Sequence, residues 1–218
     1  PTPLPFPTAR PSEYLVVVSE FVSTPSGGPG IDVYDAIVAE LEDACNTAEG
    51  ASCIIGENPQ PVQTDLQAEE LLAASGARQL VWGRVANNRL RVNLSHASLQ
   101  DLVEIRFIGT PALPSDTFFA VNTPERLRDY LAPFVLGLHF LDAQLYPAAS
   151  AQFARSRAVA AQSQLGTIDG LEYLYLFDGI ARLLNKDVQA TASFSESLTI
   201  NPRLVAARYN LALAHWSS

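Results

Sequence analysis

The sequence predicts an α/β domain (class α+β or α/β) with a mixed sheet at residues 13–122, followed by an all-α helical repeat domain at residues 123–218. Three observations carry this prediction. Short apolar runs alternate with helix-period segments between residues 13 and 106, helical periodicity continues alone from residue 124 to residue 216, and one motif occurs twice in the second half. Residues 1–12 form a proline-rich linker before both domains.

The linker has proline at every second position from Pro1 to Pro7. Proline lacks the N–H group that a helix or ladder needs, so we expect an extended polyproline II spacer. The chain contains no methionine and begins with Pro1. We therefore expect a processed or excised part of a longer protein, with the linker leading away from a removed signal or an anchor. An ordinary frayed terminus is the alternative.

The first strand is predicted at residues 14–21, an almost continuous apolar run typical of a strand buried on both faces. A loop rich in proline and glycine follows at residues 24–30, and Asp32 is a natural N-cap for the first helix. The next strand is expected at residues 53–56. These elements alternate as they do in proteins with parallel strands and crossover helices.

A second helix is predicted to begin at Thr64 or Asp65 and to end at Gly76, a residue suited to the left-handed conformation that closes many helices. A hairpin follows, with arms at residues 80–86 and 89–97 joined by two asparagines. A further strand is expected at residues 102–108. The resulting order, β-α-β-α-β-β-β, predicts a mixed sheet because parallel crossovers need helices and hairpins do not.

Residues 68–85 and 89–94 run from a predicted helix through Gly76 and Ala77 into a strand that carries Gly83 and then into a hairpin. This arrangement resembles the amino-terminal domain of TolB. The module is also similar to that of CsgG-type secretion proteins. The resemblance implies a docking or assembly module of the bacterial envelope without catalysis. This chain lacks any trace of the propeller that follows in TolB itself.

The second domain is predicted to contain five helices, the first of which has Thr123 as N-cap and Pro124 at the first helical position. Their expected ranges are residues 124–141, 147–161, 168–184, 187–200 and 203–216.

Within these helices, a motif of alanine, phenylalanine and serine occurs twice, 41 residues apart. The two copies are Ala149-x3-Phe153-x2-Ser156 and Ala190-x3-Phe194-x2-Ser197. A glycine precedes each copy, Gly137 and Gly179, and Asn201-Pro202 follows the second. This arrangement resembles a tetratricopeptide repeat, although 41 residues exceed the standard spacing of about 34. The resemblance implies a domain that holds other proteins, with small residues at helix contacts and the phenylalanines packed beside them.

The two cysteines are Cys45, at the end of the first helix, and Cys53, at the start of the next strand. An even cysteine count in a chain that begins with a stalk-like segment favours a disulfide formed in an oxidising compartment. Two reduced, half-buried thiols are the alternative. The spacing does not match the C-x-x-C motif of redox enzymes.

The net charge of −9 lies in the first half of the chain. Residues 1–125 carry 6 basic and 16 acidic side chains, whereas residues 126–218 carry 8 basic and 7 acidic ones. Binding of a phosphate backbone needs clustered lysine and arginine, so nucleic acid is not expected as a partner. The longest apolar stretch, residues 130–141, is shorter than the about 20 residues that span a membrane.

Few residues of the chain form a pattern typical of a catalytic, nucleotide-binding or metal site. Residues 26–30 lie where phosphate-binding loops occur but lack their motifs, so a crossover loop is favoured over a nucleotide site. His96, His139 and His215 fall in different elements and are interpreted as packed or surface residues. The acidic residues near the first helix match no calcium loop and indicate a solvated face: Asp32, Asp35, Glu40, Glu42 and Asp43. We therefore expect no metal, no cofactor and no enzyme activity.

The sequence thus predicts a non-catalytic interaction or scaffold subunit outside the cytoplasmic membrane, attached to a membrane only through a segment missing from this chain. The partner is expected to be a protein or a peptide, with self-association included. Stacked helix pairs leave a concave surface for such a partner. The candidate contact residues are Arg128, Tyr173, Arg182, Arg208, Asn210, Leu213 and Trp216.

The alternative function is ligand sensing, in which the α/β domain binds a small molecule at its strand ends and the repeats relay occupancy. An enzyme ranks third because no catalytic motif is recognisable. A pocket with convergent polar groups would favour sensing, whereas an exposed apolar patch would favour a scaffold.

Overall fold

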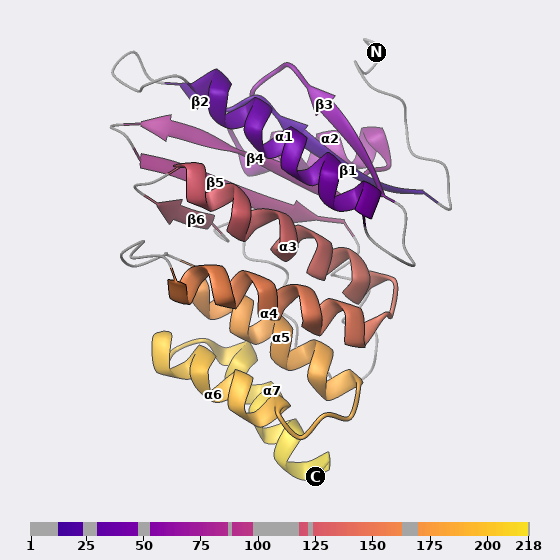
Figure 1. The fold of residues 1–218 in the computed structure, drawn as a ribbon, viewed down its shortest axis with the longest axis vertical. Helices are drawn as coiled ribbons and strands as arrows, with labels where there is room; N and C mark the ends of the chain where they lie inside the picture. The colour runs from indigo at the N-terminus through magenta and orange to yellow at the C-terminus, as the bar shows by residue number, and fades with distance from the viewer. Residues whose placement is uncertain are drawn as a thin grey trace. The chain divides into compact units, whose positions relative to one another are not determined.

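The computed structural model describes residues 13–23, 30–47, 53–86, 89–97, 118–121, 124–162 and 170–217 (Figure 1). These residues form two compact units. We call the described part of residues 13–132 the α/β unit and that of residues 133–217 the helical unit. The predicted linker at residues 1–12, the asparagine pair of the hairpin turn and the strand predicted at residues 102–108 lie outside the described residues.

The α/β unit contains a six-stranded mixed sheet, so the coarse fold prediction for this half is correct. Its strands are β1 (Tyr14–Ser19), β2 (Val22–Ser23), β3 (Cys53–Asn58), β4 (Gln79–Ala86), β5 (Arg89–His96) and β6 (Phe118–Val121). The order is β3-β1-β4-β5-β6, and β2 pairs with β4. Strand β1 runs parallel to β3 and β4, whereas β4, β5 and β6 are antiparallel neighbours. Strand β6 was not expected from the sequence.

Two helices make the parallel crossovers, α1 (Gly30–Thr47) from the first strands to β3 and α2 (Asp65–Ser75) from β3 to β4. The chain moves outward from β1 to β3 and then back across β1 to β4. Because such crossovers are right-handed, the reversal places α1 and α2 on opposite faces of the sheet. All six residues of β1 are buried, as predicted for a strand covered on both faces.

The ends of α2 follow from its sequence. Thr64 is the N-cap, and its side chain accepts a hydrogen bond from the backbone N–H of Gln67. Gly76 closes the helix in the left-handed conformation, at a φ of 68°. Both predicted ends are therefore confirmed. Leu72 of this helix packs on Leu15, Leu80 and other buried residues of the sheet, which fixes α2 against β1 and β4.

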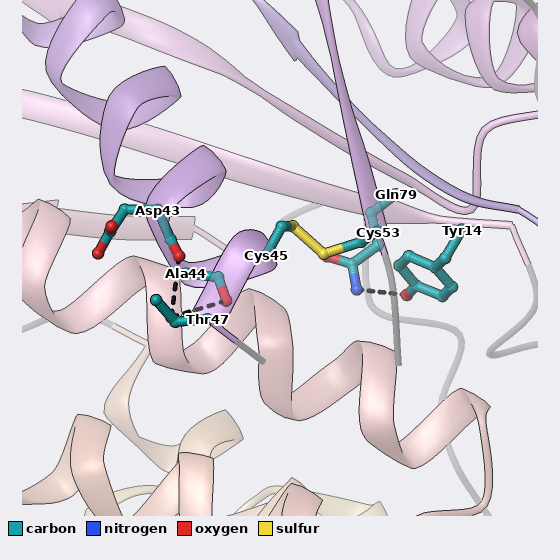
Figure 2. The surroundings of a disulfide bond; sticks show 7 residues. All are labelled: Tyr14, Asp43, Ala44, Cys45, Thr47, Cys53 and Gln79. Atoms are coloured by element: carbon teal, nitrogen blue, oxygen red, sulfur yellow. Dashed lines mark hydrogen bonds between the residues drawn. A yellow bond between two sulfur atoms is a disulfide. The ribbon is translucent and has the colours of Figure 1, made fainter. Parts of the chain in front are cut away.

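Cys45 and Cys53 form a disulfide that joins the C-terminal end of α1 to the start of β3 (Figure 2). Their Cα atoms lie 5.3 Å apart. Beside the bond, the side-chain amide of Gln79 donates a hydrogen bond to the Tyr14 hydroxyl at 2.5 Å. The predicted pairing is confirmed, and a structural disulfide of this kind is typical of an oxidising compartment.

Reduction of this disulfide is expected to lower the free energy of unfolding by about 2 to 3 kcal/mol, because the short loop between the cysteines regains freedom in the unfolded chain. Denaturant unfolding with and without reductant measures the loss. A Cys45→Ala/Cys53→Ala variant serves as the control and should not respond to the reductant. Two free thiols in the intact mass of the natively isolated protein would contradict the pairing.

Five helices follow the sheet: α3 (Pro124–Asp142), α4 (Tyr146–Gln162), α5 (Leu171–Leu184), α6 (Ala190–Ile200) and α7 (Val205–Ser217). All five were predicted, with ends within three residues. Helix α3 contains Pro133, which lacks the N–H for one intrahelical hydrogen bond, and the division between the two units falls at this residue. No helix in the described part of the chain is long and apolar enough to cross a membrane.

The repeated motif produces the same contact twice. A Cβ atom added to Gly137 would overlap the Phe153 ring, and one added to Gly179 would overlap the Phe194 ring, in each case through the same three ring atoms. The alanine, phenylalanine and serine of both copies are buried. Ser197 additionally donates a hydrogen bond from Oγ to the carbonyl of Glu172 at 2.8 Å, which ties α6 to α5. Glycine is therefore required where each phenylalanine meets the preceding helix.

Candidate functional site

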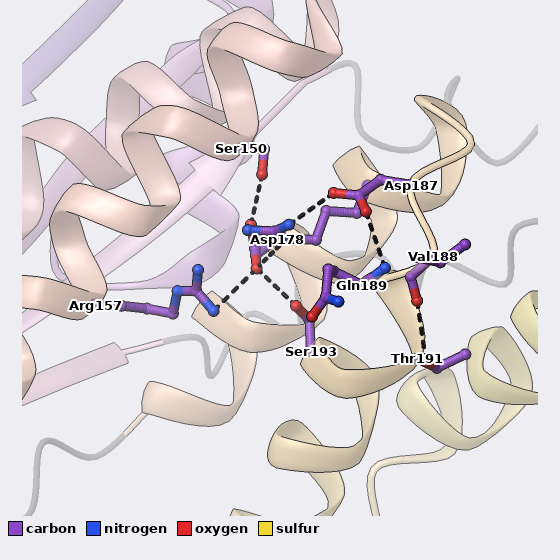
Figure 3. A network of polar contacts seen from close by, with 9 residues as sticks. Ser150, Arg157, Asp178, Asp187, Val188, Gln189, Thr191 and Ser193 are labelled. Carbon is purple, nitrogen blue, oxygen red and sulfur yellow. Dashed lines mark hydrogen bonds and ion pairs between the residues drawn. The ribbon is translucent and has the colours of Figure 1, made fainter.

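A buried carboxylate, Asp178 of α5, organises the middle of the helical unit (Figure 3). Its Oδ1 accepts a hydrogen bond from Ser150 Oγ of α4 at 2.9 Å. Its Oδ2 accepts from Ser193 Oγ of α6 at 2.7 Å and from Arg182 Nε at 2.9 Å. Arg157 Nη1 of α4 lies 3.3 Å from the same oxygen. One fully buried side chain thus connects three helices, and its charge is balanced by two guanidinium groups.

Arg182 extends this network to the loop before α6. Its Nη1 lies 2.7 Å from Asp187 Oδ2, while Asp187 Oδ1 accepts a hydrogen bond from the backbone N–H of Gln189. Burial alone would lower the pKa of Arg182, but its hydrogen bonds and ion pairs with Asp178 and Asp187 outweigh this effect and raise the pKa. Arg182 therefore stays charged and holds the loop in place.

Helix α7 packs on α5 and α6 through a face of small residues. The buried residues of this face are Ala206, Ala207, Asn210 and Ala214. Asn210 donates a hydrogen bond from Nδ2 to the carbonyl of Ala206, and its Oδ1 is buried without a hydrogen-bond partner. Because the inner face carries small side chains, the larger apolar residues of α7 lie elsewhere on the helix.

Besides its packed face of small residues, α7 has a stripe of apolar residues along its exposed side. Val205 is 74% exposed, Tyr209 45% and Trp216 83%, and Ala212 is also exposed. With 3.6 residues per turn, these positions fall within about 60° of one another around the helix axis. Such a stripe is the usual core-facing side of a helix, yet here no described residue covers it. We call Val205, Tyr209, Ala212 and Trp216 the α7 outer face.

A groove of about 580 Å³ lies beside α7 in the helical unit. Its walls come from the end of α5, the loop between α5 and α6, the start of α6 and Ala214 of α7. They include the apolar residues Leu183, Leu184 and Val188, the last of which is 71% exposed, and the charged residues Lys186 and Asp187 of the loop.

The structure corrects part of the set of candidate contact residues. Arg182 is occupied by its ion pairs with two aspartates, and Asn210 is fully buried, so neither is available to a partner. The side chain of Arg128 lies outside the described residues. Tyr173 and Leu213 are half-buried. Arg208 is exposed and donates a hydrogen bond to the Pro202 carbonyl, and Trp216 is the most exposed large apolar side chain described.

A cavity of about 410 Å³ is found in the α/β unit, at the C-terminal end of β4 and the N-terminal end of α2. Polar and charged side chains from α2, β4 and β5 line it, among them Asp65, Arg84 and Arg91. The exposed apolar stripe that favours the scaffold hypothesis therefore lies in the helical unit. The polar cavity that favours the ligand-sensing hypothesis lies in the α/β unit. Neither arginine, nor Val205 or Tyr209, was singled out from the sequence.

The three histidines are placed separately. His96 Nε2 lies 2.8 Å from the Tyr14 hydroxyl in the α/β unit, His139 is buried in α3, and His215 is exposed on α7. Within the described ranges, no group of three histidine, cysteine or acidic residues could hold a metal ion.

Comparisons of this chain with models of protein families, with curated proteins and with solved structures gave no match.

Proposed function

We propose that this protein is a non-catalytic docking or scaffold subunit whose helical unit binds another protein through the α7 outer face. The observation that carries the proposal is the exposure of Val205, Tyr209 and Trp216 along one side of a helix whose other side is packed. A stripe of this kind leaves apolar area in water unless another surface covers it. Tryptophan and tyrosine are also the residue types most often found at the energetic centre of interfaces.

Under this proposal, the helical unit is a tetratricopeptide-like array in which α3 with α4 and α5 with α6 are successive pairs. The repeated contact of Gly137 with Phe153 and of Gly179 with Phe194 supports this assignment. Helix α7 then occupies the place of a first helix in a further pair. A helix of the partner would cover it as the second helix of that pair would.

The α/β unit would serve as the assembly module in an extracytoplasmic protein. The disulfide between Cys45 and Cys53 supports this location, because such bonds persist where the surroundings are oxidising. The partner of the docking face is a protein or a peptide, and a second copy of this chain is included.

The docking proposal predicts that a Tyr209→Ser/Trp216→Ala variant loses association. Removal of an aromatic pair from an interface centre should weaken binding by about 2 kcal/mol or more, which is about thirtyfold in Kd. Sedimentation equilibrium measures self-association, and capture from the native extract on immobilised protein measures other partners. Tyr209 is preferred to Leu213 because Leu213 is half-buried and its replacement would also affect folding.

Leu66→Ser provides a matched control, since Leu66 is 64% exposed but lies on α2 of the α/β unit. This variant should retain every partner of the wild type. Two results would refute the docking role of α7. One is a wild-type protein that stays monomeric at high concentration and captures no partner from the extract. The other is a Tyr209→Ser/Trp216→Ala variant that still binds every partner of the wild type.

A further inference from the structure

The α7 outer face is bordered along one edge by basic residues. Arg208 follows Val205 by three residues and precedes Ala212 by four, the two spacings at which side chains are neighbours on a helix surface. His215 lies on the same edge, seven residues after Arg208. Both residues are exposed. A partner that covers the apolar stripe would therefore place its own polar residues against this basic edge.

The positive charge of this edge is not balanced by acidic residues of the same segment. The last of the 23 acidic residues in the sequence is Glu196, so Arg203 and Arg208 belong to a stretch, residues 197–218, without an acidic side chain. Among the described residues, no carboxylate lies within ion-pair distance of either arginine. A chain with a net charge of −9 thus presents a locally positive border beside its exposed apolar stripe.

Arg208 is held beside the stripe and keeps its charge. Its Nη2 donates a hydrogen bond to the Pro202 carbonyl at 2.5 Å, just before the start of α7. A guanidinium has five N–H donors, so others remain for a carboxylate of a partner. The first turn of α7 also carries no acidic residue, so the positive end of the helix dipole adds to the same potential. Negative charge on the partner is therefore favoured here.

A second copy of this chain is disfavoured as the occupant. In a symmetric antiparallel pair of α7 helices, the same edge of both helices lies on one side of the interface. The Arg208 side chains of the two copies would then border that side together, and like charges across an interface weaken association. A symmetric parallel pair would align the two helix dipoles instead. A different helix, antiparallel to α7 and acidic at its edge, avoids both conflicts.

An anionic lipid surface fits this face less well than a protein does. Helices that lie on membranes are rich in lysine and arginine, and segments that recognise anionic lipids carry about four to eight such residues. Residues 197–218 contain two arginines and no lysine. The charge of this segment is therefore sufficient for a few carboxylates at the edge of a helix but small for a lipid surface.

We propose that the α7 outer face binds an amphipathic helix that carries glutamate or aspartate beside its apolar stripe, with the acidic residues along the edge formed by Arg208. This inference rests on the docking function proposed above and adds the chemistry of the partner. The apolar stripe supplies the contact area, and the basic edge selects which amphipathic helices bind.

The test begins with a display library of helical peptides about as long as α7, selected on the immobilised full chain. Their apolar stripe varies among leucine, phenylalanine and methionine, and the positions beside it vary among glutamate, glutamine and lysine. We expect glutamate to be enriched beside the stripe. A selected peptide is then made in three versions, with glutamate, glutamine or lysine at those positions, and fluorescence anisotropy gives the Kd of each version.

We expect the glutamate version to bind about tenfold more tightly than the lysine version, with the glutamine version between them. Arg208→Glu should weaken binding of the glutamate version by about tenfold and strengthen binding of the lysine version, because the sign of the edge is reversed. Added salt should weaken the glutamate version more than the glutamine version. Arg155→Glu is the matched control, since Arg155 is exposed in the same unit but lies on α4, and it should change each Kd by less than about twofold.

The outcomes separate the acidic partner from the docking role itself. Equal binding of the three versions, or enrichment of lysine beside the stripe, overturns the acidic partner. The docking role still stands in that case if the Tyr209→Ser/Trp216→Ala variant loses all three versions. No selected peptide, or binding that this double variant keeps, overturns both.

Two further measurements test the other occupants. Binding of the wild type to phosphatidylglycerol vesicles, lost in the Tyr209→Ser/Trp216→Ala variant, would assign the face to a membrane. Self-association in sedimentation equilibrium, lost in the same variant, would assign it to a second copy. Either result overturns the acidic helix as the partner.

Discussion

Replacement of Asp178 by alanine is expected to destabilise the helical unit by about 3 to 5 kcal/mol, because removal of one partner from a buried ion pair leaves the other charge uncompensated. Arg157 and Arg182 would lose their shared carboxylate, and the hydroxyls of Ser150 and Ser193 would lose their acceptor. A domain is typically stable by only about 5 to 15 kcal/mol. The substitution should therefore bring the unit close to unfolding.

Two further variants make this expectation specific to the buried charge. Asp178→Asn keeps the shape and one acceptor oxygen, so its loss should be smaller than that of Asp178→Ala. Asp187→Ala removes the more exposed carboxylate beside Arg182 and should cost about 1 kcal/mol or less, as partly exposed ion pairs do. Denaturant unfolding followed by circular dichroism gives all three values. Equal losses for Asp178→Ala and Asp187→Ala would show that the network does not hold the helices together.

Replacement of Phe194 by alanine is expected to cost about 3 to 5 kcal/mol through the cavity it leaves. The ring is fully buried and fills the space beside Gly179, where a Cβ atom on that residue would overlap it. Phe153 has the same contact with Gly137, so Phe153→Ala should destabilise by a similar amount. For a chain of this size, such a loss lowers the midpoint of thermal unfolding by roughly 6 to 20 °C.

Ile200→Ala serves as the comparison within the same helix as Phe194, because Ile200 is exposed and its truncation leaves no cavity. Its effect should stay below about 1 kcal/mol. A thermal midpoint unchanged in Phe194→Ala would show that the two motif copies are not equivalent, and the assignment of repeated helix pairs would then fail.

Much of the local structure followed from the sequence. The ends of α2 were predicted from Thr64 and Gly76 because capping depends on a few neighbouring residues. The five later helices were predicted because their apolar residues recur with helical period. The disulfide was predicted because the chain has only two cysteines, at adjacent ends of a helix and a strand.

Other features depend on residues that are distant in the chain. Strand β6 is a short segment, and its place in the sheet comes only from pairing with β5. Arg84 and Arg91 become neighbours through the register of β4 and β5. Asp178 has one partner in its own helix, Arg182, but its other partners come from α4 and α6, so its central place in the network was not visible from the sequence. Periodicity describes one element at a time, so it cannot show these contacts.

The α7 helix shows most clearly which properties follow from the sequence and which depend on the tertiary structure. Its sequence determined that it is a helix with apolar residues on more than one side, and the spacing of Val205, Tyr209, Ala212 and Trp216 is visible in the printed chain. Only the tertiary structure decided which side is packed. Small residues and Asn210 face α5 and α6 because close helix packing needs small side chains, and this leaves the large apolar ones in solvent. Helical period is a property of the local backbone, whereas burial depends on which surfaces meet.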